Sequence, residues 1–538
     1  MIPLRRTRLT RFELARLGLT VVVVMAALGA LVSLLRTKDP VREARSLSFR
    51  GDDEGALDLL RAHVEHATDD REAFVLLVDT HGHATARRLE PELAALATGV
   101  ARRPITLDDD ALGVILATSR AISPRALAAR HAFARTGDLD AALDRVFADP
   151  PSVRDLVELG RVAHDYGLDE AATALFALVL ESPSDDAGVA RALALESAAS
   201  LAEPDRLRAL LGDPRFRAVA SDDVLFVAAE DDDDHVSLVR LAWRMAFSRM
   251  TPVVIATCLV VGGAWMFFLL VVGAAWEWSW STRAKAALGI VAGLASGLLT
   301  LAVVVVMDDL IEHAAREQTI LYQLVYCVFG IGFREEMVKL LCIAPVLLLM
   351  KKTEHEGVLL IVASLGGLGF AIEENASYFD IAMDASPVVI ARFLTANFLH
   401  LSLTGLVGFH FALAVRRGGK EWDTFTTTFI QAVVAHGLYD FLLMAPLGDG
   451  MSMFAMTVFV WIAQRYLTDL IAYFPMKTRP VALSTALTIT LAVAVGANFD
   501  LVAIEVGVRA ALDLTFLGLL GNAIIAIVFY RSLGEEIL

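Results

Sequence analysis

Residues 325–350 read VYCVFGIGFREEMVKLLCIAPVLLLM, an apolar stretch that is interrupted by ionisable side chains. An α-helix needs about 20 apolar residues to cross roughly 30 Å of hydrocarbon, so this stretch can span a membrane. Glu335, Glu336 and Lys339 fall near its middle. A charged group at that depth costs about 2.5–3.5 kcal/mol on insertion scales, so a chain that retains several of them is expected to use them.

The composition of the whole chain is that of a polytopic membrane protein. Of 538 residues, 56% are hydrophobic, and the mean hydropathy is +0.58. The formal charge is −16 and no basic patch is present, which argues against a nucleic-acid partner. All three cysteines lie in apolar runs, so neither a disulfide framework nor a cysteine-based metal site is expected.

We expect an all-α protein with three parts. Residues 1–36 combine a basic stub with an apolar run, which we interpret as an uncleaved membrane anchor; a signal peptide would export the following segment in the same way. Residues 37–245 show helical periodicity between Asp, Pro and Gly breaks. This pattern is typical of a tetratricopeptide-like array that binds peptides or proteins, or of a helical domain without a ligand. Residues 252–530 form the polytopic membrane domain, with its motifs in 320–446.

The apolar runs predict nine spans after the anchor, which makes ten in total. These spans are expected near 252–274, 284–306, 320–350, 357–381, 388–414, 425–446, 451–474, 480–498 and 506–530. Every second loop is basic, through Arg283, Lys285, Lys351, Lys352, Arg416, Arg417, Lys420, Lys477, Arg479 and Arg531. Because basic loops stay in the cytoplasm, both termini are predicted to be cytoplasmic and residues 37–245 extracytoplasmic, in a bacterial-type cell membrane.

Glu335, Glu336 and Lys339 form an E-E-x-x-K motif. Lys339 follows the glutamates by four and three residues, so the three side chains share one face of a helix. The lysine can neutralise one carboxylate, while the other stays available as a base. The alternative is a self-compensating charge cluster at an interfacial kink, which suits the middle of an apolar stretch less well.

The segment GGLGFAIEEN at 366–375 adds a second polar group inside an apolar run. Its glycines permit the close approach on which helix packing in membranes relies. Glu374 is the predicted functional carboxylate, and Asn375 is a predicted donor to an oxyanion. Glu373 points about 100° away from Glu374 on a helix and receives no role.

Two histidines complete the set of candidate residues. His400 lies near the middle of its apolar run, where a single histidine could equally be a hydrogen-bonding group between helices. His436 and Asp440 form an H-x-x-x-D pair one helical turn apart. The carboxylate of such a pair can set the tautomer of the imidazole. His410 is expected at the membrane interface.

The ordered motifs E-E-x-x-K, G-F-x-x-x-E-N-x-x-Y, a histidine followed by T-G, and H-x-x-x-D resemble the PrsW family of intramembrane proteases over residues 320–446. That family is distantly similar to type II CAAX prenyl endopeptidases and bacteriocin-processing enzymes. The resemblance implies a membrane-bound protein or peptide substrate, such as an anti-sigma factor. It matches family positions to Glu335 and Glu336 (the catalytic glutamate pair), Lys339, Glu374, His400 and His436.

The predicted reaction is peptide-bond hydrolysis by an activated water. One glutamate of the E-E-x-x-K motif would act as general base, and its partner, held by the lysine, would orient or shuttle the proton. His400, His436 and Asn375 would stabilise the oxyanion and protonate the leaving amine. Asp440 would position His436.

A metal-free site is favoured, because the chain has no H-E-x-x-H motif and Lys339 stands beside the glutamates. The alternative is a Zn²⁺ ion held by His400 and His436 with Glu335 or Glu374. No other cofactor is expected.

Two other functions stay open. The buried charges could serve a proton- or cation-coupled transporter, although the chain shows none of the internal symmetry that is typical of such carriers. The chain could also be a non-catalytic membrane receptor whose exported domain carries the function.

Overall fold

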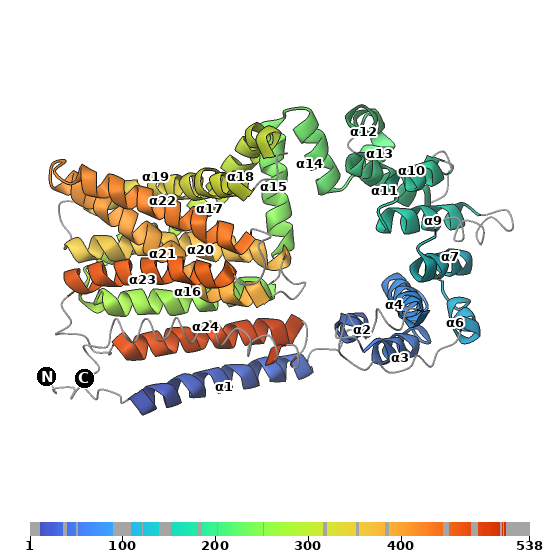
Figure 1. Ribbon diagram of the computed structural model, residues 1–538, viewed down its shortest axis with the longest axis horizontal. Coiled ribbons are helices and arrows are strands. Elements are labelled where there is room, and N and C mark those ends of the chain that lie inside the picture. The colour runs from blue at the N-terminus through green and yellow to red at the C-terminus, as the bar shows by residue number, and fades with distance from the viewer. Residues whose placement is uncertain are drawn as a thin grey trace. The chain divides into compact units, whose positions relative to one another are not determined.

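The structure is a computed structural model that describes most of the chain between residues 11 and 512. Every regular element in the described part is a helix, which confirms the all-α prediction (Figure 1). The chain divides into two compact units. We name Met1–Leu35 with Ala242–Leu538 the membrane unit and Arg36–Leu241 the N-terminal unit. The residues outside the described part are 1–10, 36–39, 50–51, 90–108, 121, 139–151, 178, 180–185, 202, 251, 316–319, 351–354, 382–386, 445–450, 475–482, 506–507, 509–510 and 513–538.

Short helices with well-formed ends build the N-terminal unit. They are α2 (Pro40–Phe49), α3 (Asp53–Val64), α4 (Arg71–Leu89), α6 (Asp109–Leu116), α7 (Pro124–Thr136), α9 (Val153–Asp165), α10 (Asp169–Ala177), α11 (Asp186–Ser200), α12 (Pro204–Leu211), α13 (Pro214–Arg217) and α14 (Asp222–Asp231). In α7, the Ser123 hydroxyl accepts from Ala126 N at 3.1 Å, and Gly137 ends the helix at φ 68°. These are the usual start and stop signals of a helix. The tetratricopeptide-like character of this unit stays a prediction.

A buried arginine joins three helices of the N-terminal unit. Arg130 on α7 donates through Nε and Nη2 to both carboxylate oxygens of Asp79 on α4, each at 2.8 Å. It also donates through Nη1 to Asp165 on α9 at 2.5 Å. Burial lowers the pKa of Arg130, but the hydrogen bonds and charges of the two aspartates outweigh this and raise the pKa above its ordinary value. The guanidinium therefore stays charged and ties the helices together.

Longer helices form the membrane unit. They are α1 (Arg11–Leu35), α15 (His235–Arg249, which begins in the N-terminal unit), α16 (Pro252–Val272), η1 (Ala275–Glu277), α17 (Trp280–Ala315), α18 (Ile320–Val325), η2 (Tyr326–Phe333), α19 (Arg334–Met350), α20 (Glu356–Ile381), α21 (Pro387–Arg416), α22 (Trp422–Met444), α23 (Met451–Tyr473) and α24 (Leu483–Glu505). Five of them, α16, α17, α20, α21 and α24, are long and apolar enough to cross a membrane. The chain is thus a multi-pass membrane protein. The count of ten spans stays a prediction, and the last predicted span, 506–530, lies almost entirely outside the described residues.

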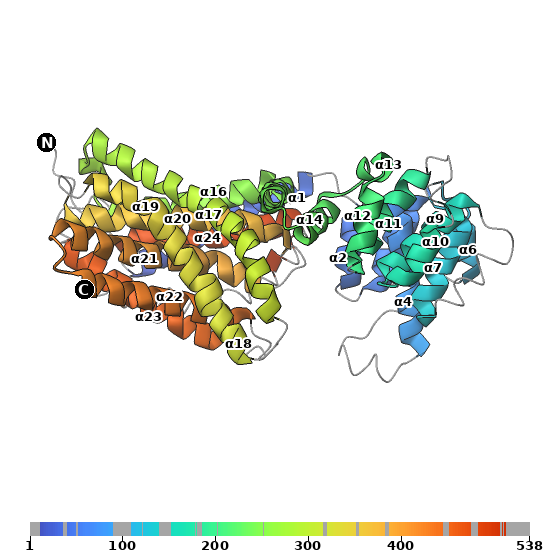
Figure 2. The same cartoon turned by 90° about the horizontal axis from the view of Figure 1, so that it is seen from above.

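Helices α20 and α21 form the centre of the membrane unit. Their most apolar windows are 83% and 89% buried, whereas that of α17 is only 22% buried. In Figure 2 they lie between the green α16–α17 pair and the orange α22–α23 pair. The predicted close approach is present, because a Cβ on Gly367 of α20 would lie 2.2 Å from the His400 carbonyl oxygen on α21. This contact places the segment that carries Glu374 against the segment that carries His400.

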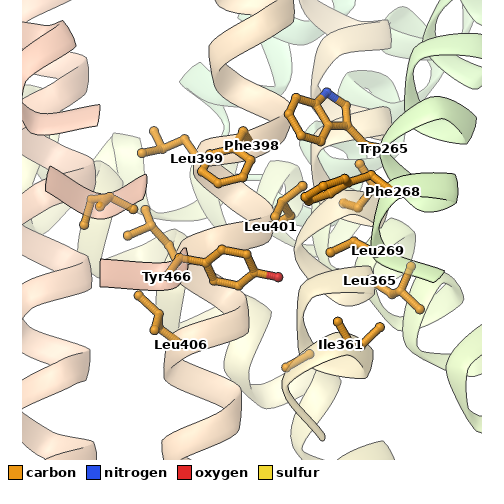
Figure 3. Packing of buried hydrophobic residues seen from close by; sticks show 14 of the residues in the cluster. Trp265, Phe268, Leu269, Ile361, Leu365, Phe398, Leu399, Leu401, Leu406 and Tyr466 are labelled. Atoms are coloured by element: carbon orange, nitrogen blue, oxygen red, sulfur yellow. The ribbon is translucent and has the colours of Figure 1, made fainter. Parts of the chain in front are cut away.

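Large rings fill the space beside this central pair (Figure 3). Trp265 of α16 lies 5.3 Å from Phe398 of α21, and Phe398 lies 5.7 Å from Tyr466 of α23, measured between ring centroids. The Tyr466 hydroxyl is paired with Ser364 Oγ at 2.8 Å. Close packing of this kind holds membrane helices together where lipid gives no hydrophobic driving force. It fixes the helices that carry the candidate residues.

The predicted span 320–350 is not one regular helix. Its middle, η2, is a π-helix that separates α18 from α19. η2 packs closely on α22, because a Cβ on Gly437 would lie 2.4 Å from the Cys327 carbonyl oxygen and one on Gly332 would lie 2.6 Å from that of Val433. Short π-helical segments occur frequently at functional sites. Here the crossing places the first turn of α19 beside His436 of α22.

Candidate functional site

Four helices bring ionisable side chains together inside the membrane unit. We name this group the ionisable cluster; it consists of Glu335, Glu336 and Lys339 on α19, Glu374 on α20, His400 on α21, and His436 and Asp440 on α22. All seven belong to the set that the sequence predicts. Their convergence depends on contacts between residues up to 100 positions apart in the chain.

Lys339 is the buried basic residue of the ionisable cluster. Its Nζ donates to Glu335 Oε2 at 3.2 Å and to Glu336 Oε1 at 2.9 Å, as the spacing of the E-E-x-x-K motif predicts. The same Nζ lies 2.9 Å from His400 Nδ1 and 3.8 Å from the ring centroid of Phe370. The ammonium is therefore surrounded by acceptors from three helices.

The ring of His436 is oriented by Glu336. His436 Nδ1 lies 2.9 Å from Glu336 Oε1, a hydrogen bond in which the ring donates. Its other nitrogen, Nε2, lies 3.5 Å from Glu335 Oε2 and 3.4 Å from Asp440 Oδ2. The predicted H-x-x-x-D pair is present, but Glu336 makes the shorter contact with the imidazole. His436 Nε2 is left facing two carboxylates.

The ring of His400 is oriented in the opposite sense. An ammonium can only donate, so His400 Nδ1 accepts from Lys339 and the ring proton lies on Nε2. That nitrogen faces Glu374 Oε2 at 2.6 Å. The two imidazole rings stand 5.1 Å apart between centroids. Each ring thus has one nitrogen in close contact with a single carboxylate, Glu336 for His436 and Glu374 for His400, and a second nitrogen that faces other members of the cluster.

Burial differs across the cluster. The side chains of Glu336, Lys339, His400 and His436 are at most 2% exposed, whereas those of Glu335, Glu374 and Asp440 are 10%, 11% and 12% exposed. The three more exposed carboxylates are the members of the cluster that a water or a peptide can reach most easily.

Charge in the cluster is not balanced by its own members. Its four carboxylates face a single ammonium, which leaves three negative charges when both imidazoles are neutral. Buried charges are stable only when they are paired or bound to metal. The cluster is therefore suited to hold protons or a further cation.

The donor atoms fit a metal ion. Glu335, His400 and His436 each offer one ligand atom, and these atoms lie within 4.8 Å of one another. Two imidazoles and a carboxylate are a common ligand set for catalytic zinc. The second nitrogens of the two histidines, His436 Nδ1 and His400 Nε2, contact Glu336 and Glu374, the carboxylate–histidine arrangement that orients metal-bound histidines. Of the two carboxylates that the sequence offered as a ligand, the geometry favours Glu335, because Glu374 faces the far nitrogen of His400.

Three further polar residues of α20 and α21 complete the comparison with the sequence. Asn375, the predicted oxyanion donor, is buried directly after Glu374 on α20. Glu373 faces α17, since a Cβ on Gly297 would lie 2.1 Å from its Oε2. His410, expected at the interface, is buried on α21 with its Nε2 3.4 Å from Asp469 Oδ2.

Sequence reasoning missed two contributions to the site. Gly332 and Gly437 permit the crossing of η2 and α22, and the ring of Phe370 lies under the Lys339 ammonium. Small residues inside an apolar run are the signal that could have identified the glycines. An aromatic one turn before Glu374 is too common in membrane helices to predict a cation contact.

Comparison with known proteins agrees with the resemblance in the motifs. Residues 254–464 match the family model described as PrsW family intramembrane metalloprotease. No curated protein and no solved structure gives a significant match. The matched residues include the whole ionisable cluster, and the word metalloprotease supports the metal alternative that the sequence left open.

Proposed function

We propose that the ionisable cluster of this membrane peptidase cuts membrane-associated proteins, and the match of residues 254–464 to the PrsW family intramembrane metalloprotease model supports this proposal. In this proposal Glu335, His400 and His436 hold a divalent cation of the zinc type. Such an ion, when bound, supplies an activated water and polarises the scissile carbonyl.

One observation carries the proposal. A carboxylate from α19 and two imidazoles from α21 and α22 place their ligand atoms within 4.8 Å of one another. Packing alone would not favour this convergence, because burying unbalanced charge is costly. A bound cation would balance the charge of the buried carboxylates and so offset this cost during catalysis.

The remaining residues of the cluster then take distinct tasks. Glu336 orients His436, and Glu374 orients His400, through the contacts of 2.9 and 2.6 Å. Asp440 lies 3.4 Å from the inward-facing nitrogen of His436, at the more exposed edge of the cluster. We assign it to accept the proton of the attacking water, because the Asp440 side chain is partly exposed, whereas that of Glu336 is fully buried. Asn375 is the candidate donor to the oxyanion.

The cellular setting follows the same proposal. The substrate would be a membrane-bound signalling protein of the anti-sigma-factor kind, cleaved in regulated proteolysis. Both chain ends would lie in the cytoplasm, because the basic loops fall on that side. Residues 37–245 would lie outside it and capture the substrate or sense a signal, as helical arrays bind peptides.

Substitutions of two proposed metal ligands, compared with a control substitution of a histidine outside the cluster, test the proposal. His436→Gln and Glu335→Gln should abolish substrate loss from cell membranes, measured by quantitative proteomics, and should remove zinc from the purified protein. His410→Gln is the control, because His410 is also buried but lies 3.4 Å from Asp469 rather than in the cluster.

The alternatives give different results. If the chain is a transporter, Glu335→Gln should abolish solute uptake and leave the abundance of every membrane protein unchanged. If it is a receptor, the variant should change neither solute uptake nor substrate cleavage. Substrate cleavage that continues in a folded Glu335→Gln protein would refute the ionisable cluster as the site of hydrolysis.

A further inference from the structure

The Lys339 ammonium lies where a metal would need to bind. Its Nζ is 3.2 Å from Glu335 Oε2 and 2.9 Å from His400 Nδ1. Because His400 Nε2 faces Glu374 at 2.6 Å, Nδ1 is the nitrogen that remains for a metal. An ammonium and a metal ion cannot use the same lone pairs, and they repel each other at short distance.

We propose that Lys339 is a displaceable internal counter-ion, which shares Glu335 and His400 with the metal ion and moves to Glu336 when the metal binds. This inference rests on the proposed function, since it requires the metal site. It adds a task that neither the motif nor the family description assigns to the lysine.

The structure contains a place for the displaced ammonium. Glu336 Oε1 is 2.9 Å from Nζ and is not a proposed ligand. Glu336 Oε2 is buried without a hydrogen-bond partner in the described part of the chain. A buried carboxylate oxygen left in this way is costly, and an ammonium that moves fully onto Glu336 would satisfy it. The ring of Phe370, 3.8 Å from Nζ, would still face the charge.

Lys339 also stabilises the metal-free cluster. With Lys339 removed, the four carboxylates of the cluster would face no cation among its members. Carboxylates that are buried together without a cation repel one another and destabilise a folded protein strongly. Lys339 therefore keeps the ligands assembled before the metal arrives and weakens metal binding in return, because its contacts with Glu335 and His400 must be broken.

Zinc affinity of the purified full-length protein in lipid nanodiscs tests this inference. Competition with a chromophoric chelator should show that Lys339→Gln binds zinc about tenfold tighter than the wild type, or more, because a positive charge leaves the ligand set. Without zinc the same variant should unfold at a lower temperature, and zinc should restore its stability. Lys339→Met, which keeps the apolar stem, should behave in the same way.

The matched control is Arg465→Gln, which removes one positive charge from α23 at a side chain that is 45% exposed. Its zinc affinity should equal that of the wild type. A folded Lys339→Gln protein with equal or weaker zinc affinity would overturn the counter-ion role alone. Lys339 variants that stay unfolded in zinc would also overturn it, because the metal should replace the missing charge. Absence of zinc binding in both wild type and variants would refute the metal site and this inference together.

Discussion

The two units of the molecule each hold a buried basic side chain in a cluster of carboxylates, and the two clusters are built on different principles. In the N-terminal unit, Arg130 has hydrogen bonds from all three guanidinium nitrogens to Asp79 and Asp165. In the membrane unit, four carboxylates compete for one lysine, and Glu336 Oε2 has no partner within the described residues. A satisfied cluster stabilises the fold, whereas an unbalanced one indicates a site that receives something else.

The largest effect is expected where the satisfied cluster is broken. Arg130→Met leaves Asp79 and Asp165 without their cation. Breaking a fully buried pair costs about 3–5 kcal/mol, and this is the upper bound here because the Asp79 and Asp165 side chains are 21% and 40% exposed. Thermal unfolding of the full-length protein should show an early transition in the N-terminal unit. Metal binding by the membrane unit should not change. Unchanged unfolding of the variant would mean that Arg130 is not the structural centre that its contacts indicate.

In the unbalanced cluster, an orienting carboxylate should affect binding more than stability. Glu336→Gln weakens the hold on His436 Nδ1, now 2.9 Å away, and loss of such partners typically costs about 10–100-fold in metal affinity. Zinc competition measures this directly, and thermal unfolding checks that the fold is kept. If the variant loses much stability but keeps its zinc affinity, Glu336 has a structural role like that of Arg130.

The next largest effect is expected where η2 and α22 cross at Gly437. Gly437→Ala puts a Cβ about where the Cys327 carbonyl lies, at 2.4 Å, so η2 and α22 must separate, at a cost of about 1–3 kcal/mol. The displacement should also reduce proteolysis, because His436 precedes this glycine. Gly263→Ala on α16 is the matched control, since a Cβ there meets nothing within 4 Å. Equal behaviour of the two variants would contradict the crossing as the origin of the site.

The smallest effect concerns pH and the N-terminal unit alone. Burial raises the pKa of Asp155, but hydrogen bonds from Ser123 and Ser152 outweigh it and lower the pKa below the ordinary 3.8. A lowered folded pKa contributes stability that is present above the unfolded value and lost as pH falls through the folded value. Asp155→Asn should therefore flatten the acid limb of the unfolding curve of this unit. An unchanged acid limb would exclude Asp155 as its origin.

Local patterns were reliable where neighbours on one helix decide the geometry. The spacing of Glu335, Glu336 and Lys339 predicted one shared face, and both ion pairs are present. The same rule placed His436 one turn before Asp440 and turned Glu373 away from Glu374. Residues on the same helix have fixed relative directions, so these inferences needed no tertiary information.

Contacts between helices could not be predicted in this way. The sequence paired His436 with Asp440, but the shorter contact comes from Glu336, 100 residues earlier. It gave no sign that the predicted span 320–350 contains the π-helical η2 between α18 and α19. The choice of Glu335 over Glu374 as a metal ligand also depends on which nitrogen of His400 faces inward.

By itself, the sequence determined that the chain is a helical membrane protein with an ordered set of acidic and imidazole groups, because hydropathy and helical period are local properties. The tertiary structure alone decided which carboxylate orients which histidine and where the ammonium lies. Those relations depend on how α19, α20, α21 and α22 pack, and small residues at their crossings set that packing.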